Sequence, residues 1–181
     1  MDLQRLEKNL YDNILEAQVK LGYDGRPMSL NYTLASLSHL TGAACNTDSI
    51  KAMLTEFSAA AASRFGDISF RPIKDGFCLT VPSEGTGYVN KASDGKEFIR
   101  AFIGLLQTHP SIDDVIALFR SRSENVTVTE MDNEEFKYLM YFTDGTPDDY
   151  RYCITAEEEI DGSIHVTYHR FTKEDYDDLG F

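Results

Sequence analysis

The order of apolar patterns over residues 1–83 constrains the fold of this chain more than any other feature. Residues 3–21, 34–40 and 50–65 place apolar side chains three and four positions apart, which gives a helix one buried stripe. MSLNY, between the first two stretches, is a short extended segment. ISFRPI and FCLTV follow the third stretch and are typical of two strands. The predicted order is helix, strand, helix, helix, hairpin.

That order is the one found in winged-helix domains, in which a helix-turn-helix is followed by a β-wing. Thr33 is the expected N-cap of the second helix, and Gly42 is its expected end. We therefore expect a winged-helix-like N-terminal unit over residues 1–83, built from three helices and a β-hairpin.

The predicted wing turns at Asp75-Gly76, a pair that suits a two-residue type I′ loop. Such a loop pairs Lys74 with Phe77. It collects the apolar side chains of both strands on one face: Ile68, Phe70, Leu79 and Val81.

Residues 84–181 predict a second, acidic unit. SEGTGYVNKASDG, at its start, has the small and polar composition of a linker. A helix is expected from about Asp94 to the break at His109-Pro110, and Ser111 and Asp114 have the spacing of a capping box for another.

Four segments rich in β-branched and aromatic residues complete the chain: NVTVTEM, EFKYLMYF, YRYCITAEE and SIHVTYHRF. They predict an antiparallel sheet covered on one face by helices. We expect an α+β protein in which the winged-helix-like unit packs on these helices and this sheet, as two domains or one continuous domain.

The final hairpin is predicted to have a three-residue loop, Asp161-Gly162-Ser163, with Gly162 at positive φ. This loop pairs Ile160 with Ile164. It places six residues on one face: Tyr152, Ile154, Ala156, Ile164, Val166 and Tyr168.

The opposite face of that hairpin carries the best candidates for a ligand or partner surface. In the predicted register Glu159 lies opposite His165, and Glu157 and His169 share the same face. An acid beside a histidine could be an acid/base pair, although a solvated, charge-compensated sheet face has the same appearance. Four residues along a strand separate His165 from His169 by roughly 13 Å, which excludes chelation of one metal by this pair.

The predicted sheet is also rich in tyrosine, including Tyr138 and Tyr141. Tyrosine is favoured in recognition surfaces, and equally in cores whose hydroxyls reach solvent. We assign no catalytic residue, metal ligand or cofactor, because the sequence has no GxSxG, P-loop, dinucleotide fingerprint or CxxC motif.

The charge distribution disfavours nucleic acid as a ligand. Residues 1–83 have a net charge of −1 and residues 84–181 a net charge of −12. The third helix, which reads DNA in winged-helix proteins, presents small and nearly neutral side chains outside its apolar stripe, and the wing adds Arg71 and Lys74.

The number of cysteines, their spacing and the hydropathy of the chain indicate the cellular compartment of the protein. Cys45, Cys78 and Cys153 are far apart and odd in number, and no apolar run approaches the ~18 residues of a membrane span. We expect a cytoplasmic protein without a membrane partner.

The stretch EAQVKLGYDGRPMSLNYTLASLSHLTG resembles the N-terminal signature of a family of uncharacterised proteins from gut Firmicutes. In that family a helix ends in a KLGY-like turn and is followed by an extended segment and a leucine-spaced helix closed by glycine. The resemblance is clearest over residues 12–45. It implies a small bacterial protein, and no activity or site residue carries over.

The function we favour from the sequence is a non-catalytic protein-interaction or regulatory module, acting on a protein partner or by self-association. One alternative is a DNA-associated winged-helix regulator. The other is a small-ligand-binding protein or enzyme that uses the face of His165, His169 and Glu159.

Overall fold

The computed structural model describes residues 2–181, which form seven helices and two antiparallel sheets. The α+β class is as predicted. The chain divides into two compact units: unit 1 comprises residues 1–94 and unit 2 comprises residues 95–181. This division falls after the expected boundary at residue 83, because the residues that follow it fold as part of unit 1.

Unit 1 contains the three predicted helices, α1 (Leu3–Leu21), α2 (Leu34–Thr41) and α3 (Thr47–Phe65). Thr33 caps α2 as predicted, since its side chain accepts a hydrogen bond from the Ser36 amide at 3.0 Å. Gly42 ends the helix in the left-handed conformation, at φ 71°. Leu21 departs from the predicted stripe of α1, since 86% of its surface is exposed.

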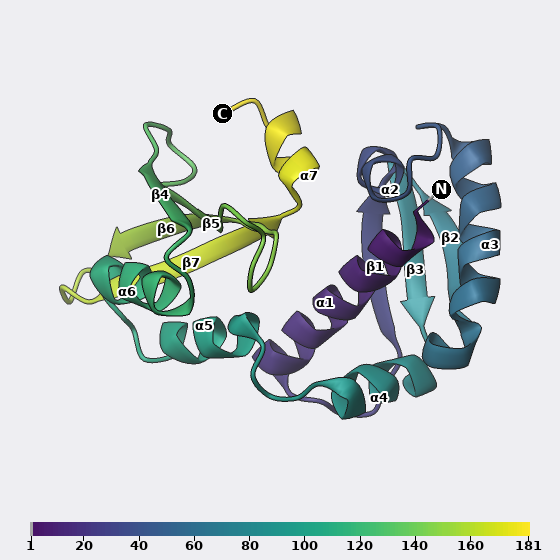
Figure 1. Cartoon of the computed structure of the whole chain (residues 1–181), viewed down its shortest axis with the longest axis horizontal. Coiled ribbons are helices and arrows are strands. Elements are labelled where there is room, and N and C mark those ends of the chain that lie inside the picture. Colours follow the sequence, from purple (N-terminus) through teal and green to yellow (C-terminus); the bar gives the residue numbers. More distant parts are fainter. Residues whose placement is uncertain (1) are drawn as a thin grey trace. The chain divides into compact units, whose positions relative to one another are not determined.

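The strands of unit 1 form one sheet in the order β1-β3-β2 (Figure 1). β1 (Met28–Thr33) and β2 (Ser69–Ile73) both pair antiparallel with the central strand β3 (Gly76–Val81). The predicted extended segment is thus a third strand beside the hairpin. β3 is buried over most of its length, as a central strand should be.

The predicted wing register was wrong. The loop is Lys74-Asp75, so Ile73 pairs with Gly76, whereas the prediction paired Lys74 with Phe77. Gly76 is needed for packing and not for the turn: a Cβ there would overlap the carbonyl oxygen of Tyr32 on β1. The shift is two positions, so Phe70 and Leu79 still share a face.

The predicted linker after residue 82 was also wrong, because Ser83–Ala92 form helix α4. Val89 is fully buried, and Tyr88 packs edge-on against Phe65 of α3 with ring centroids 5.4 Å apart. Gly85 lets α4 approach the backbone of α3, since a Cβ there would lie 2.5 Å from the Phe65 carbonyl oxygen. The segment has the composition of a linker, but the contacts of α4 with α1 and α3 make it part of unit 1.

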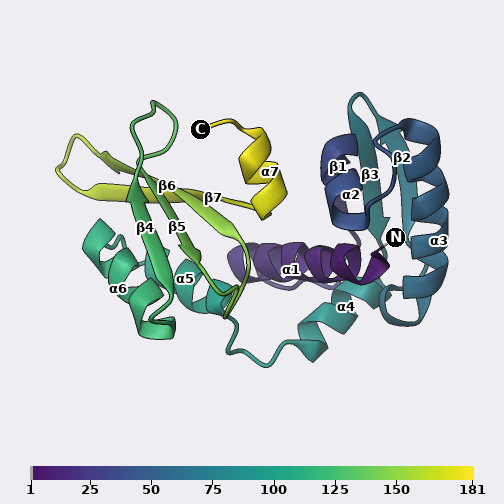
Figure 2. The same ribbon diagram turned by 45° about the horizontal axis from the view of Figure 1, so that its top comes forward.

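Unit 2 consists of helices α5 (Phe98–Leu106), α6 (Ile112–Arg122) and α7 (Lys173–Asp178) and a four-stranded sheet (Figure 2). Its strands are β4 (Val126–Glu130), β5 (Tyr138–Phe142), β6 (Arg151–Glu158) and β7 (Ile164–Phe171), in that order. The predicted capping box of α6 is present: Ser111 Oγ accepts from the Asp114 amide, and Asp114 Oδ2 accepts from the Ser111 amide.

Helix α5 begins at Phe98, later than the expected start near Asp94. Gly95 between them adopts φ 78°, which no continuing helix permits.

α5 and α6 cover one face of the sheet with an aromatic core, whereas α7 lies on the other side (Figure 1). Phe98 and Phe102 of α5 and Phe119 of α6 pack against Tyr152, at centroid distances of 5.6, 5.1 and 5.3 Å. The Tyr152 hydroxyl is satisfied by Asp148 Oδ2 at 2.6 Å.

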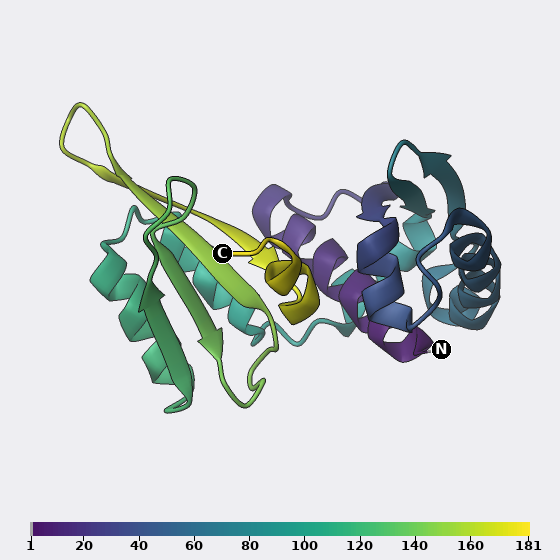
Figure 3. The same ribbon diagram turned by 90° about the horizontal axis from the view of Figure 1, so that it is seen from above.

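The predicted register of the last hairpin was wrong, although its faces were right. Glu158 pairs with Ile164 where Ile160 was expected, and the loop spans residues 159–163. The Glu159 amide donates to the Ser163 carbonyl at 2.8 Å, and Gly162 has the predicted positive φ, 80°. The five-residue turn moves the register by two positions, which leaves each side chain on its predicted face. Figure 3 shows this hairpin extending beyond the other strands.

Candidate functional site

The structure does not bring the two candidate tyrosines together. Tyr138 pairs with Ile154 and therefore faces α5 and α6, whereas Tyr141 lies on the opposite face. There the Arg151 guanidinium carbon is 3.9 Å from the centre of the Tyr141 ring, a cation–π contact.

The candidate residues Glu157, His165 and His169 are exposed and lie on the same side of the sheet. Glu157, not Glu159, is opposite His165 because of the register shift. Glu159 lies in the loop, and His169 is opposite Cys153 and stacks on Phe171 with centroids 6.1 Å apart. The three side chains of the proposed acid/base face are therefore spread along the strands and the turn.

The turn of this hairpin has a neighbour that the sequence did not indicate. The His109 ring lies 6.5 Å from that of His165, and His109 has a left-handed φ of 54°. The pKa of the Asp161 carboxyl is lowered by hydrogen bonds from the side chain and amide of Ser163 and, to a smaller degree, by the charge of His109. In residues 2–181 no three acidic, histidine or cysteine side chains gather as a metal would require.

We call the side of this sheet that faces away from α5 and α6 the Cys153 face. Its centre is a buried cluster of Phe136, Leu139 and Cys153, against which Met131, Tyr141, Phe171 and Tyr176 pack. Burial, and then the charge of Glu135, raises the pKa of the Cys153 thiol to about 11, so this cysteine is protonated at neutral pH.

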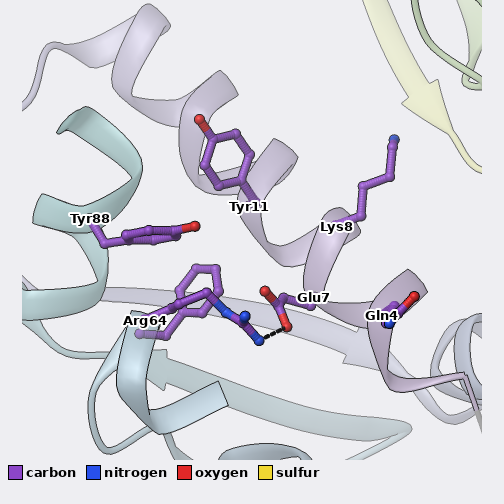
Figure 4. Close-up of a pocket in the computed structure, with 7 residues that line it drawn as sticks. Gln4, Glu7, Lys8, Tyr11, Arg64 and Tyr88 are labelled. Carbon is purple, nitrogen blue, oxygen red and sulfur yellow. Dashed lines mark hydrogen bonds and ion pairs between the residues drawn. The ribbon is translucent and has the colours of Figure 1, made fainter. Parts of the chain in front are cut away.

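Unit 1 carries a hollow that sequence reasoning missed, which we call the Tyr88 groove (Figure 4). Its volume is about 340 Å³. Residues from α1, the end of α3 and α4 line it: Gln4, Glu7, Lys8, Tyr11, Arg64, Phe65 and Tyr88. The sequence predicts a linker over residues 83–95, so no pattern in it places Tyr88 on a structured wall.

Aromatic rings and an ion pair define the groove. The Tyr11 and Tyr88 rings meet edge-on at 6.3 Å, and Tyr88 rests in turn on Phe65. Below them Arg64 Nη2 donates to Glu7 Oε2 at 2.6 Å (Figure 4). The Arg64 side chain remains 44% exposed, so its guanidinium can reach a ligand.

A second hollow of about 560 Å³ is also lined by Arg64 and Tyr88. Its other lining residues come from the link after α1, the end of α3 and α4: Tyr23, Ala62, Ser63, Gly66, Ser83, Glu84, Gly87 and Lys91. Arg64 and Tyr88 are therefore the two residues that line both hollows.

Hydrogen bonds hold α4 against α1 and against the link that follows α1, and so form the wall of the groove. Gln18 of α1 donates through Nε2 to the Thr86 carbonyl at 2.8 Å, and the Thr86 hydroxyl donates to the Arg26 carbonyl at 3.1 Å. Gly66 ends α3 at φ 68°, which directs the chain away immediately after Arg64 and Phe65.

Comparison with known proteins matches residues 3–180 to the family described as "Domain of unknown function, E. rectale Gene description (DUF3877)". The chain belongs to the DUF3877 family. Membership confirms the resemblance to uncharacterised proteins of gut Firmicutes and extends it from the N-terminal signature to nearly the whole chain. No curated protein and no solved structure matches it.

The DUF3877 match names no ligand, so the chemistry of the site depends on its residues alone. In the part of the chain that the structure describes, residues 2–181, no helix is long and apolar enough to cross a membrane.

Proposed function

We propose that this DUF3877 protein is a non-catalytic recognition module that binds a protein partner in the Tyr88 groove. The observation that carries the proposal is that the exposed Arg64 and the half-buried Tyr88 line both hollows, on walls formed by three helices. Tyrosine and arginine are the residues that most often dominate the energetics of protein interfaces. The proposed place of action is the cytoplasm, consistent with three free cysteines.

The groove suits a protein segment better than a small charged metabolite. Its arginine is neutralised by Glu7 and its Lys8 by Asp12, at 2.6 and 2.9 Å, so no excess charge remains to hold a small anion. Its aromatic walls offer apolar area with little conformational entropy to lose, as preformed protein-binding sites do.

We further propose that unit 1 is winged-helix-like. The element order α1-β1-α2-α3-β2-β3 and the sheet order β1-β3-β2 support this interpretation, because both are expected of such a domain. Winged-helix scaffolds serve both DNA and protein recognition, so the fold alone does not decide between them.

The surface of α3 favours the protein partner. Its exposed face carries two cations, Lys51 and Arg64, against the two anions Asp48 and Glu56, and Arg64 is paired with Glu7. Small side chains make up the rest: Ala52, Thr55, Ala59, Ala60 and Ser63. Unit 1 as a whole has nine Lys and Arg against eleven Asp and Glu, a net charge of −2, which repels phosphate.

The test is quantitative affinity capture from the native organism, followed by titration with the purified partner. Arg64→Ala is expected to weaken binding by at least ~2 kcal/mol, roughly 30-fold in Kd, the size of an interface hot spot. The charge-swapped double variant Arg64→Glu, Glu7→Arg is the matched control for the fold: it keeps the ion pair but removes the guanidinium from its position. Equal affinity of all three proteins would refute the groove as the binding site.

A DNA-associated regulator is the second candidate, favoured by the element order alone. Its test is retention on immobilised duplex DNA at low ionic strength, with elution by salt. We expect no retention; retention that is lost on Lys51→Glu would establish the DNA-binding alternative.

A further inference from the structure

The Cys153 face is covered by the last segment of the chain that the structure describes. After β7, residues 172–181 form α7 and a short extension. Tyr176 packs against the buried cluster of Phe136, Leu139 and Cys153, and the Phe181 ring lies 5.6 Å from that of Phe136. Tyr176 and Phe181 contact each other at 6.3 Å, so two aromatic side chains attach this segment to the sheet.

Several features make this attachment weak. α7 has six residues, none of them buried, and a helix this short has little stability of its own in water. Two hydrogen bonds within the segment cap the helix at its ends: the Asp175 amide donates to Thr172 Oγ1, and the Leu179 amide donates to the Tyr176 carbonyl. The apolar side chains beyond the helix remain partly exposed, Leu179 by 43% and Phe181 by 51%.

The covered surface is apolar at its centre and more polar around it. Cys153 and Phe136 are almost fully buried, and Tyr141 and His169, two residues that the sequence suggested for recognition, lie on the same side of the sheet. Burial, followed by the neighbouring Cys153, raises the pKa of Tyr176, which agrees with the packing of this side chain against the Cys153 cluster.

We propose that residues 172–181 form a removable strap that masks the Cys153 face. Unit 2 then has a masked form, which is the structure described here, and an unmasked form in which Phe136, Leu139 and Cys153 are accessible. Such a low-energy local opening is expected where a segment has few buried contacts. The strap lies in unit 2 and does not depend on the groove of unit 1.

The three cysteines provide the test within the full-length chain. Each is followed for its rate of alkylation by a maleimide, with digestion and mass spectrometry to distinguish the sites. Cys45 is exposed and reports the intrinsic rate, Cys78 is buried in unit 1 and reports unfolding there, and Cys153 reports strap opening. In the wild type we expect the rates to fall in the order Cys45, Cys153, Cys78.

Removing a strap contact should selectively increase the rate at Cys153. Tyr176→Ala and Phe181→Ala are each expected to accelerate its alkylation about tenfold, the effect of losing an aromatic contact of ordinary strength, with Cys78 unchanged. Tyr138→Ala is the matched control, because it removes the same side chain from the opposite face of the same sheet. Unchanged labelling of Cys153 in both strap variants, or equal acceleration by Tyr138→Ala, would overturn the proposal.

Hydrogen exchange on the wild type is a second test, and its result does not depend on whether a variant folds. The amides of residues 175–180 should exchange much faster than those of β6 and with no dependence on global unfolding. Exchange of both segments at one common rate would also overturn the strap.

Discussion

The substitution Gly85→Ala tests whether α4 is an integral part of unit 1. Ordinarily a glycine replaced by alanine within a helix stabilises it by about 0.8–1 kcal/mol. At Gly85 the added methyl group would lie 2.5 Å from the Phe65 carbonyl oxygen and would also overlap Val81. Both contacts involve buried, rigid groups, so α4 must move away from α3, at a cost of about 1–3 kcal/mol or more.

The two overlaps, at 2.4 and 2.5 Å, argue for the upper part of this range, about 2–3 kcal/mol, so we expect a net loss of about 1–2 kcal/mol in the free energy of unfolding once the helix propensity gain is subtracted. Gly104→Ala in α5 is the matched control, since no atom lies within 4 Å of the position that its added methyl group would take, and the propensity gain should appear in full.

The assay is thermal unfolding followed by far-UV circular dichroism, because the chain has no tryptophan. For units of this size each kcal/mol corresponds to a shift of about 4–8 °C in Tm. The two substitutions should therefore move the Tm of their respective units in opposite directions. A Gly85→Ala protein as stable as the wild type, or more stable, would refute the close packing of α4 on α3.

Two further predictions concern unit 2. Tyr152→Phe removes the buried hydroxyl that donates to Asp148 and should lower the free energy of unfolding by about 1.5–3 kcal/mol in urea denaturation, while leaving the aromatic core in place. Hydrogen bonds from Ser111 hold the pKa of Asp114 below its ordinary value, so the carboxylate stabilises the fold fully above the pKa of the unfolded chain and loses its effect as the pH falls through the lowered pKa. The Tm difference between wild type and Asp114→Asn should accordingly be largest near neutral pH and disappear in acid; a constant difference would contradict this assignment.

Local chemistry was sufficient where a residue acts on its immediate neighbours. The cap at Thr33, the capping box of Ser111 and Asp114, and the positive φ of Gly162 were all predicted, because each satisfies backbone groups within a few residues. The faces of the strands were also predicted, because side chains alternate along a strand and this fixes which side of the sheet each residue occupies.

Partners distant in sequence were less accessible to such reasoning. Both hairpin registers were displaced by two positions, because several turns preserve the same faces and only the loop geometry selects among them. Gly76 illustrates the difficulty: it looked like a turn residue, yet its lack of a side chain serves the approach of β1.

The sequence by itself determined the helices α1, α2, α3, α5 and α6, the strands, the caps and the charge layout of this chain, since these follow from periodicity and from short-range hydrogen bonding. Only the tertiary structure decided that Ser83–Ala92 is a helix, that Tyr88 and Arg64 share a groove, and that Tyr176 covers Cys153. The physical reason is that burial against a distant surface can outweigh local preference: Gly85 and Gly87 favour a loop, but Val89 and Tyr88 gain more by packing on α1 and α3 than a loop would gain in freedom.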